Sequence, residues 1–89
     1  TLLIESNHDT EVLMAGPHHP SVKERVAGPL GHLSNDQVSA FIESSLPPTI
    51  ERLILGHLSK QANTPQLAAA SAMRALQRAG RPGVLLEVA

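Results

Sequence analysis

The sequence predicts a small α/β fold in the order strand, helices, strand, helix, strand. The segments at residues 2–4, 51–55 and 84–89 each contain a short apolar run and have the length and composition of strands. The segments between them carry the caps and apolar spacing of amphipathic helices. These connections are long enough to join parallel neighbours, so a parallel sheet with crossover helices is expected.

The first half of the chain predicts one strand and two short helices. Residues 2–4 form the continuous apolar run of a strand that is buried on both faces. Asp9 is placed to cap a helical turn through residues 12–14, and the Gly-Pro pair at 16–17 ends that turn. Apolar residues spaced by four predict a further short helix at residues 21–27.

The second half contains the clearest helix signals. Ser34 is followed three residues later by Gln37, which is a capping-box pattern, and the prolines at 47–48 end that helix. After the second strand, Thr64 followed by proline starts the last helix, and Gly80 suits the position just beyond its end. Four residues are expected to share the apolar face of this last helix: Ala69, Ala72, Met73 and Leu76.

Composition limits the possible classes of protein. The 89 residues allow one domain, and a net charge of −1 gives no indication of a basic, nucleic-acid-binding face. The absence of cysteine excludes disulfides and a Cys-ligated zinc site. No apolar run approaches the roughly 18 residues of a membrane span. Both ends of the chain resemble strands rather than polar tails, so we expect a piece cut from a longer protein.

Polar residues gather where the predicted strands end. The phrase GHLS occurs at residues 31–34 and 56–59, and the differing flanks argue against a duplication. In parallel sheets, sites form beyond the carboxyl ends of strands, where Glu5 and His57 both fall. His57 is either a metal ligand, with Ser59 or Asn63 orienting its ring, or an ordinary strand-end residue.

His32 has two interpretations as well. It lies between a glycine and the N-cap Ser34, as a loop histidine would. The functional alternative is a general acid or a substrate-binding residue whose ring is hydrogen-bonded to a carboxylate, for which Glu5 is the natural candidate. The residues taken alone thus predict half of an α/β site at one edge of the sheet.

The order of short motifs resembles a known family. The chain contains LLIESNHD, a Gly-Pro pair, a helix with lysine and Arg-Val, GHLSN, a strand ending in LGHLS, and NTP before an Ala-rich helix. This order resembles the C-terminal part of metallo-β-lactamase-fold hydrolases, over nearly the whole chain. The resemblance is closest to the YycJ/WalJ branch, whose members resemble cytoplasmic DNA exonucleases.

The resemblance implies that residues 1–89 are the C-terminal segment of one metallo-β-lactamase-fold domain, an αββα sandwich whose N-terminal half is absent. It implies two divalent metal ions, zinc or manganese, held mostly by an HxHxDH motif and further ligands in that missing half. The expected partners are the rest of the chain and a nucleic acid substrate, DNA. The isolated segment is then expected to be inactive and to bind metal weakly.

The resemblance also implies roles for individual residues. His57 matches the last metal-binding histidine of the fold. Glu5 and His32 match the glutamate–histidine pair credited with proton delivery to the leaving group. Six further residues are expected to support these three or to bind substrate: Asn7, His8, Asp9, Ser34, Ser59 and Asn63.

The implied function is metal-dependent hydrolysis of phosphodiester bonds by a cytoplasmic exonuclease that does not use a membrane. Within the enzyme class, the alternative is a tRNase Z-like or small-molecule phosphodiesterase. Outside it, the alternative is a non-catalytic interaction module that docks through its apolar strand edges. Two departures from the family pattern bear on substrate preference: His18 replaces the usual aromatic after Gly-Pro, and Ala62 replaces an asparagine before Asn63.

Overall fold

The computed structural model describes residues 1–16 and 32–89. The described residues form six elements: β1 (Leu2–Glu5), α1 (Thr10–Ala15), α3 (Asn35–Ser45), β2 (Arg52–Gly56), α4 (Pro65–Arg78) and β3 (Leu85–Val88). This order confirms the predicted alternation of strand, helices, strand, helix and strand. The helix predicted at residues 21–27 lies outside the described residues.

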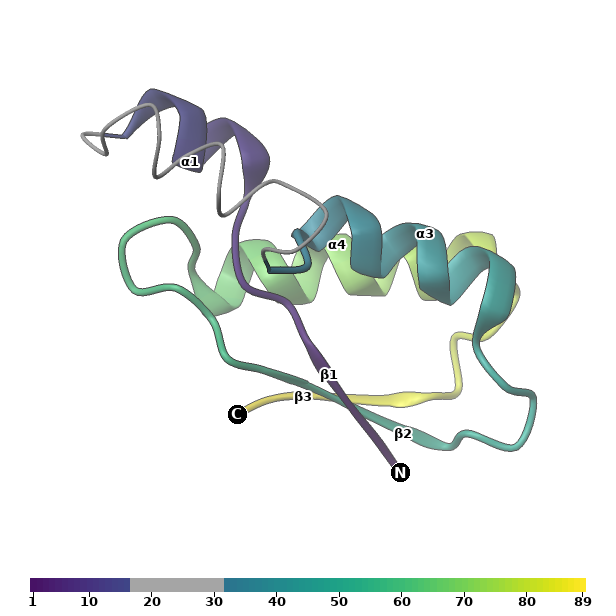
Figure 1. Cartoon of the computed structure of the whole chain (residues 1–89). Coiled ribbons are helices and arrows are strands. Elements are labelled where there is room, and N and C mark those ends of the chain that lie inside the picture. Colours follow the sequence, from purple (N-terminus) through teal and green to yellow (C-terminus); the bar gives the residue numbers. More distant parts are fainter. Residues whose placement is uncertain (17–31) are drawn as a thin grey trace.

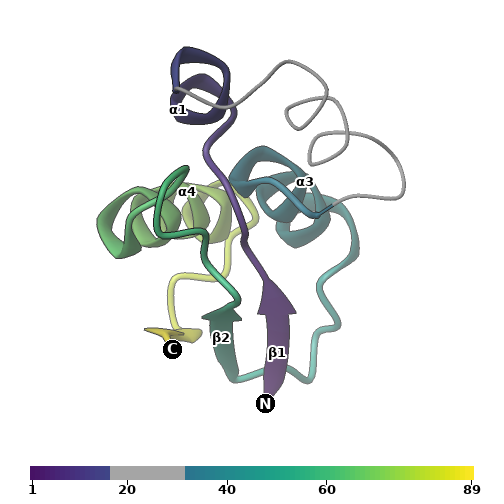
Figure 2. The same ribbon diagram turned by 60° about the vertical axis from the view of Figure 1, so that its left-hand side comes forward.

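The three strands form one parallel sheet in the order β1-β2-β3. Figure 2 shows β1 and β2 side by side and pointing the same way. The register pairs Ile4 with Leu55, and Leu55 with Val88. It also sets Glu5 opposite Gly56, so the carboxyl ends of β1 and β2 meet at one edge of the sheet.

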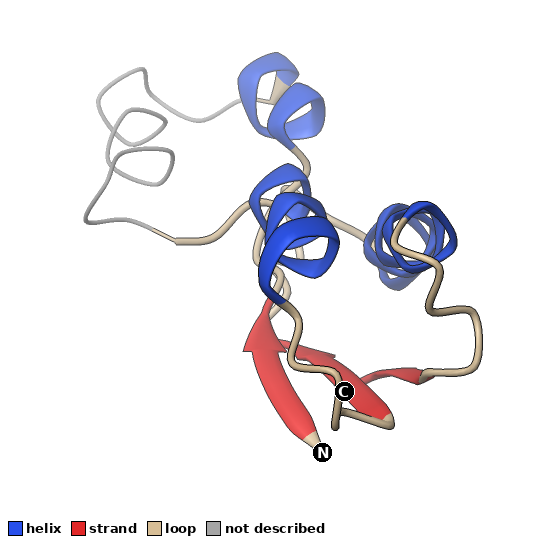
Figure 3. Ribbon diagram, turned by 90° about the vertical axis from the view of Figure 1, so that its right-hand side faces the viewer, coloured by secondary structure: helices blue, strands red, loops and turns tan. Residues whose placement is uncertain are grey.

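Helices α3 and α4 lie on the same side of the sheet (Figures 1 and 3). The core between these two layers consists of nine buried side chains: Val38, Ile42, Leu46, Leu53, Leu55, Ala68, Ala72, Ala75 and Leu76. The alanines let α4 approach the sheet closely. The expectation that Met73 belongs to the apolar face was wrong, because the buried stripe runs through Ala68, Ala72 and Ala75 and leaves Met73 exposed.

The opposite face of the sheet is open in the described residues. Leu3 and Leu85 are each 66% exposed there, and Arg52 of β2 pairs with Glu87 of β3 at 2.7 Å. The prediction that the first strand is buried on both faces is therefore wrong for this structure. Alternate residues of a strand point to opposite faces, and helices cover only one of them.

The helix ends follow the predicted caps. The Asp9 carboxylate accepts the Val12 N–H at 3.0 Å, and the Thr64 hydroxyl accepts the Leu67 N–H at 3.0 Å. Ser34 and Gln37 form the complete capping box at the start of α3. Gly80 follows α4 with φ 71°, the left-handed conformation that glycine adopts at little cost. Local sequence therefore sets where these helices begin and end.

Among residues 1–16 and 32–89, none of the helices has the length and apolar character needed to span a membrane.

Candidate active site

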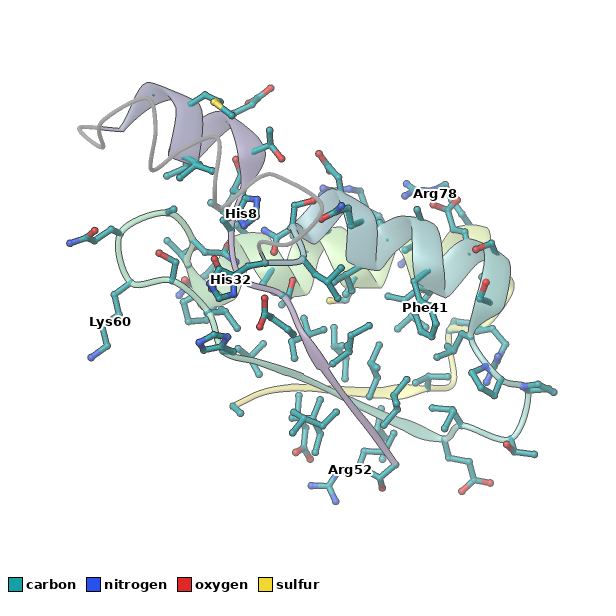
Figure 4. All side chains as sticks on the ribbon, viewed as in Figure 1. His8, His32, Phe41, Arg52, Lys60 and Arg78 are labelled. Atoms are coloured by element: carbon teal, nitrogen blue, oxygen red, sulfur yellow. The ribbon has the colours of Figure 1, made fainter. Side chains whose placement is uncertain are left out.

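Glu5 joins two histidines at the carboxyl edge of the sheet. Its Oε1 accepts a hydrogen bond from His32 Nδ1 at 2.9 Å, and its Oε2 accepts one from His57 Nδ1 at 2.6 Å. The two imidazole rings are 5.1 Å apart between centroids and meet edge to face. Figure 4 shows His8 and His32 near one end of β1, with Arg52 near its other end. The expected pairing of Glu5 with His32 is confirmed, and the contact with His57 adds to it.

Opposing effects act on the Glu5 carboxyl group. Burial raises its pKa, but hydrogen bonds from His57, from the Leu33 N–H at 3.1 Å and from His32 outweigh burial and hold the pKa below its usual range. The carboxylate has no hydrogen to donate, so each Nδ1 must carry one. The two Nε2 atoms are then the nitrogens left to accept a proton or a metal ion.

The donor atoms of this cluster fit a divalent metal ion. One ligand atom from each of Glu5, His32 and His57 can be chosen so that all three lie within 4.8 Å of one another. Zinc ligands lie about 2.0–2.2 Å from the ion when they are nitrogen or oxygen, so direct binding by all three needs small shifts. The present hydrogen bonds fit a simpler arrangement, in which His57 binds through Nε2 while Glu5 holds Nδ1, as metal-ligating histidines usually require.

The site is open toward solvent. The side chains of Glu5 and His57 are 27% and 66% exposed. Three protein ligands complete at most one catalytic zinc site, whose fourth position takes water or substrate. A second ion would need ligands beyond this cluster, which is the largest such group among the residues the structure describes.

The backbone of His57 is in an unusual conformation. Its φ of 56° is left-handed, which for a residue other than glycine costs on the order of 1–3 kcal/mol. The Asn7 side-chain amide donates to the His57 carbonyl at 3.0 Å and holds the backbone there. Strained backbone is typical of functional sites. The strained residue His57 is also the one whose ring bonds Glu5, so both observations indicate the same site.

The ring of His57 is not oriented by the residues expected to do so. Ser59 Oγ instead accepts the N–H groups of Gln61 and Ala62, which shapes the loop after β2. The Asn63 side chain points into a buried polar network. The prediction that Ser59 or Asn63 orients the His57 ring was wrong. The strand register places Glu5 of β1 beside Gly56, and the Glu5 carboxylate accepts the hydrogen bond from His57 Nδ1 instead.

A buried network of Ser6, Asn35 and Asn63 lies beside the site. The two amides exchange hydrogen bonds, Asn35 Nδ2 to Asn63 Oδ1 at 3.0 Å and Asn63 Nδ2 to Asn35 Oδ1 at 2.9 Å. The Ser6 hydroxyl donates to Asn35 Oδ1 at 2.6 Å, and its carbonyl accepts from Asn63 Nδ2 at 2.9 Å. No sequence pattern singled out Asn35, because an asparagine in the first turn of a helix is usually solvated.

His8 and Asp9 connect the end of β1 to its neighbours through backbone hydrogen bonds. The His8 carbonyl accepts the Asn35 N–H at 2.8 Å, and Asp9 N–H donates to the Ala62 carbonyl at 2.8 Å. The His8 side chain is 1% exposed, and burial, aided by the charge of His32, lowers its pKa. With the capping role of Ser34, every residue expected to support the site now has a described contact.

The fold and this cluster define a candidate metal site: a carboxylate and two histidines at the carboxyl edge of a parallel sheet, with the ligand types that zinc takes in proteins. Two curated relatives specify it further. The chain is 41% identical to the exodeoxyribonuclease WalJ of Streptococcus pneumoniae over 66 residues, which are 74% of this chain and 24% of that protein. It is 31% identical to the exodeoxyribonuclease YycJ of Bacillus anthracis over 78 residues, which are 88% of this chain and 30% of that protein.

These similarities confirm the predicted resemblance to the YycJ/WalJ branch. The chain spans 24% to 30% of the length of these relatives. No family model matches the chain. No solved structure matches it either.

Proposed function

We propose that residues 1–89 are the C-terminal segment of a metallo-β-lactamase-fold DNA exonuclease of the YycJ/WalJ type, active only with the rest of its domain. One observation supports this most: Glu5 holds both His32 and His57 at the edge of the sheet where sites of α/β folds lie. The two relatives carry the name exodeoxyribonuclease, which favours DNA over the tRNase Z-like and small-molecule alternatives. The cytoplasmic location expected from the resemblance is part of this proposal.

The proposed cofactors are two divalent ions, zinc or manganese, bound mostly by ligands outside this segment. His57 contributes one ligand through Nε2, while Glu5 keeps the ring in place through Nδ1. When bound, such ions activate water and neutralise charge on the phosphodiester group.

His32 is proposed as the general acid. Its Nδ1 donates to Glu5, so the imidazolium form presents the proton on Nε2 to the departing oxygen. The Glu5 carboxylate compensates the positive charge of that imidazolium. Because Glu5 bonds both rings, it sets the distance between the metal ligand His57 and the general acid His32. Both histidines can then act on the same phosphate group.

The six remaining residues are proposed to support these three rather than to touch substrate. Asp9 and Ser34 cap helices, Ser59 bonds the loop after β2, and Asn63 belongs to the buried network. The side chains of Asn7 and His8 bond the His57 carbonyl and each other, and four of the six residues are buried. The four buried residues are Asn7, His8, Ser34 and Asn63.

The test uses the full-length protein that contains this chain. His57→Ala should lower both bound metal and DNA cleavage, because it removes a ligand. His32→Ala should retain the metal and lose about 10²–10⁴-fold in turnover, as expected for a lost general acid. Ser44→Ala, on the exposed face of α3, is the control and should change neither.

Three results would contradict the proposal. Full activity in both histidine variants would exclude an enzyme that uses this site. Cleavage of precursor tRNA or a small phosphodiester in place of linear DNA would favour the corresponding alternative. A folded full-length protein without bound metal and without hydrolysis of any of these substrates would favour the interaction module.

A further inference from the structure

Asn7 contacts both loops that carry the site histidines. Its backbone N–H donates to the Leu33 carbonyl at 2.8 Å, next to His32, and its carbonyl accepts the Ser59 N–H at 2.7 Å. Its side-chain Nδ2 donates to the carbonyl of His57 at 3.0 Å. Asn7 itself is 7% exposed, so these bonds are shielded from water. One residue therefore ties the end of β1 to the segments on either side of it.

The direction of the His57 ring depends on this tie. The ring is largely exposed, and its one described polar contact is the 2.6 Å hydrogen bond to Glu5. The left-handed backbone at φ 56° aims the ring toward Glu5, and this hydrogen bond then holds it there. At the preceding Gly56, a Cβ would meet Leu3 Cδ1 at 3.1 Å, a tight contact with the side chain of an exposed residue. The side-chain amide of Asn7 stabilises this unfavourable backbone conformation by donating a hydrogen bond to the His57 carbonyl.

His8 determines which way the Asn7 amide faces. His8 Nδ1 lies 3.3 Å from Asn7 Oδ1, and because that oxygen has no hydrogen, Nδ1 must be the donor. The amide oxygen is thereby used, and Nδ2 is left for the His57 carbonyl. Burial favours the neutral form of His8, which has a single ring N–H to place.

We propose that Asn7 is a positioning residue of the site, whose carboxamide, oriented by His8, holds the left-handed backbone of His57 and so aims the His57 imidazole between Glu5 and a metal ion. The part of this inference that concerns the metal rests on the proposed function. The part that concerns the ring does not, because the contacts of Asn7, His8 and Glu5 are present without any metal.

The experiment compares full-length protein with its Asn7→Ala variant by two measurements. The first is ¹⁵N NMR of the His57 imidazole in metal-free protein, which reports the Nδ1 hydrogen bond to Glu5. The second is calorimetric titration with Mn²⁺ and with Zn²⁺. Asn7→Ala should shift the His57 signals and weaken metal binding about 10- to 100-fold, as loss of a partner that orients a ligand does.

Two further variants separate positioning from general stability. Ser39→Ala removes a buried hydroxyl that bonds Ser71 between α3 and α4, away from the site, and should lower stability without changing either measurement. Asn7→Asp keeps the shape but cannot donate to the His57 carbonyl. It is followed by the NMR signals alone, because its added charge attracts cations, and it should reproduce their shift even if Asn7→Ala does not fold.

Unchanged His57 signals in Asn7→Asp, or metal affinity within about twofold of the wild type in folded Asn7→Ala, would overturn the inference. The outcomes also separate it from the proposed function. If the wild-type protein cleaves no DNA while Asn7→Ala still shifts the His57 signals, the function fails and the positioning role holds. If it cleaves DNA and Asn7→Ala changes neither measurement, the function holds and the positioning role fails.

Discussion

The buried amide pair between Asn35 and Asn63 makes a quantitative prediction about stability. Asn35→Ala removes three described hydrogen bonds: the 2.6 Å bond from Ser6 and the two amide bonds with Asn63. The Asn63 amide keeps partners, since its Nδ2 still donates to the Ser6 carbonyl and its Oδ1 still accepts the Thr64 N–H. The Ser6 hydroxyl, 1% exposed, is left without its described acceptor.

The cost follows from these losses. An orphaned buried polar group costs about 1–3 kcal/mol, and each of two further lost hydrogen bonds costs about 0.5–1.5 kcal/mol. We therefore expect Asn35→Ala to lower the free energy of unfolding by about 4 kcal/mol, within a range of about 2–6 kcal/mol. Few single substitutions in proteins cost more than about 4–5 kcal/mol, so this would be a severe change.

The assay is denaturant unfolding of the full-length protein followed by circular dichroism, since this segment has no tryptophan or tyrosine to report by fluorescence. Ser44→Ala is the matched control, because Ser44 lies on the same helix, is exposed and bonds only Ala40 and Ser45 among its described contacts. It should change stability by less than about 0.5 kcal/mol. If Asn35→Ala costs no more than this control, the buried network does not hold the site segments together.

Two other predictions concern protonation and backbone conformation. The pKa of buried His8 is below its ordinary 6.5, so the unfolded chain takes up a proton first and stability falls as the pH drops below about 6.5; Glu5, whose pKa is also lowered, adds a loss below about 4.5. Thermal unfolding between about pH 7.5 and about pH 5.5 should show this, and His8→Gln should flatten the difference; an unchanged profile would contradict it. Gly80→Ala should cost about 1 kcal/mol by chemical denaturation, because φ is 71° and no atom lies within 4 Å of the added Cβ; no loss would show that the turn relaxes.

The sequence by itself determined the local structure. Helix caps act within a few residues of sequence, so the N-cap residues Asp9, Ser34 and Thr64 set the starts of α1, α3 and α4 without tertiary contacts. Apolar runs likewise placed the three strands. The sequence did not determine which face of each helix or strand is buried, as the exposed Met73 and Leu3 show. Burial depends on which neighbouring element covers each face.

The tertiary structure alone decided how the site is assembled. Glu5 reaches His32 and His57 across 27 and 52 residues of sequence. The parallel register of β1 and β2 brings Glu5 next to His57, and the backbone contacts of Asn7 with Leu33 and of His8 with Ser34 bring in the segment of His32. Motif resemblance named these residues, but it did not predict that one carboxylate holds both rings. Neither did it predict the Asn35–Asn63 pair. Long-range hydrogen bonds depend on distances of a few ångströms between segments, and those distances exist only once the helices and strands have packed.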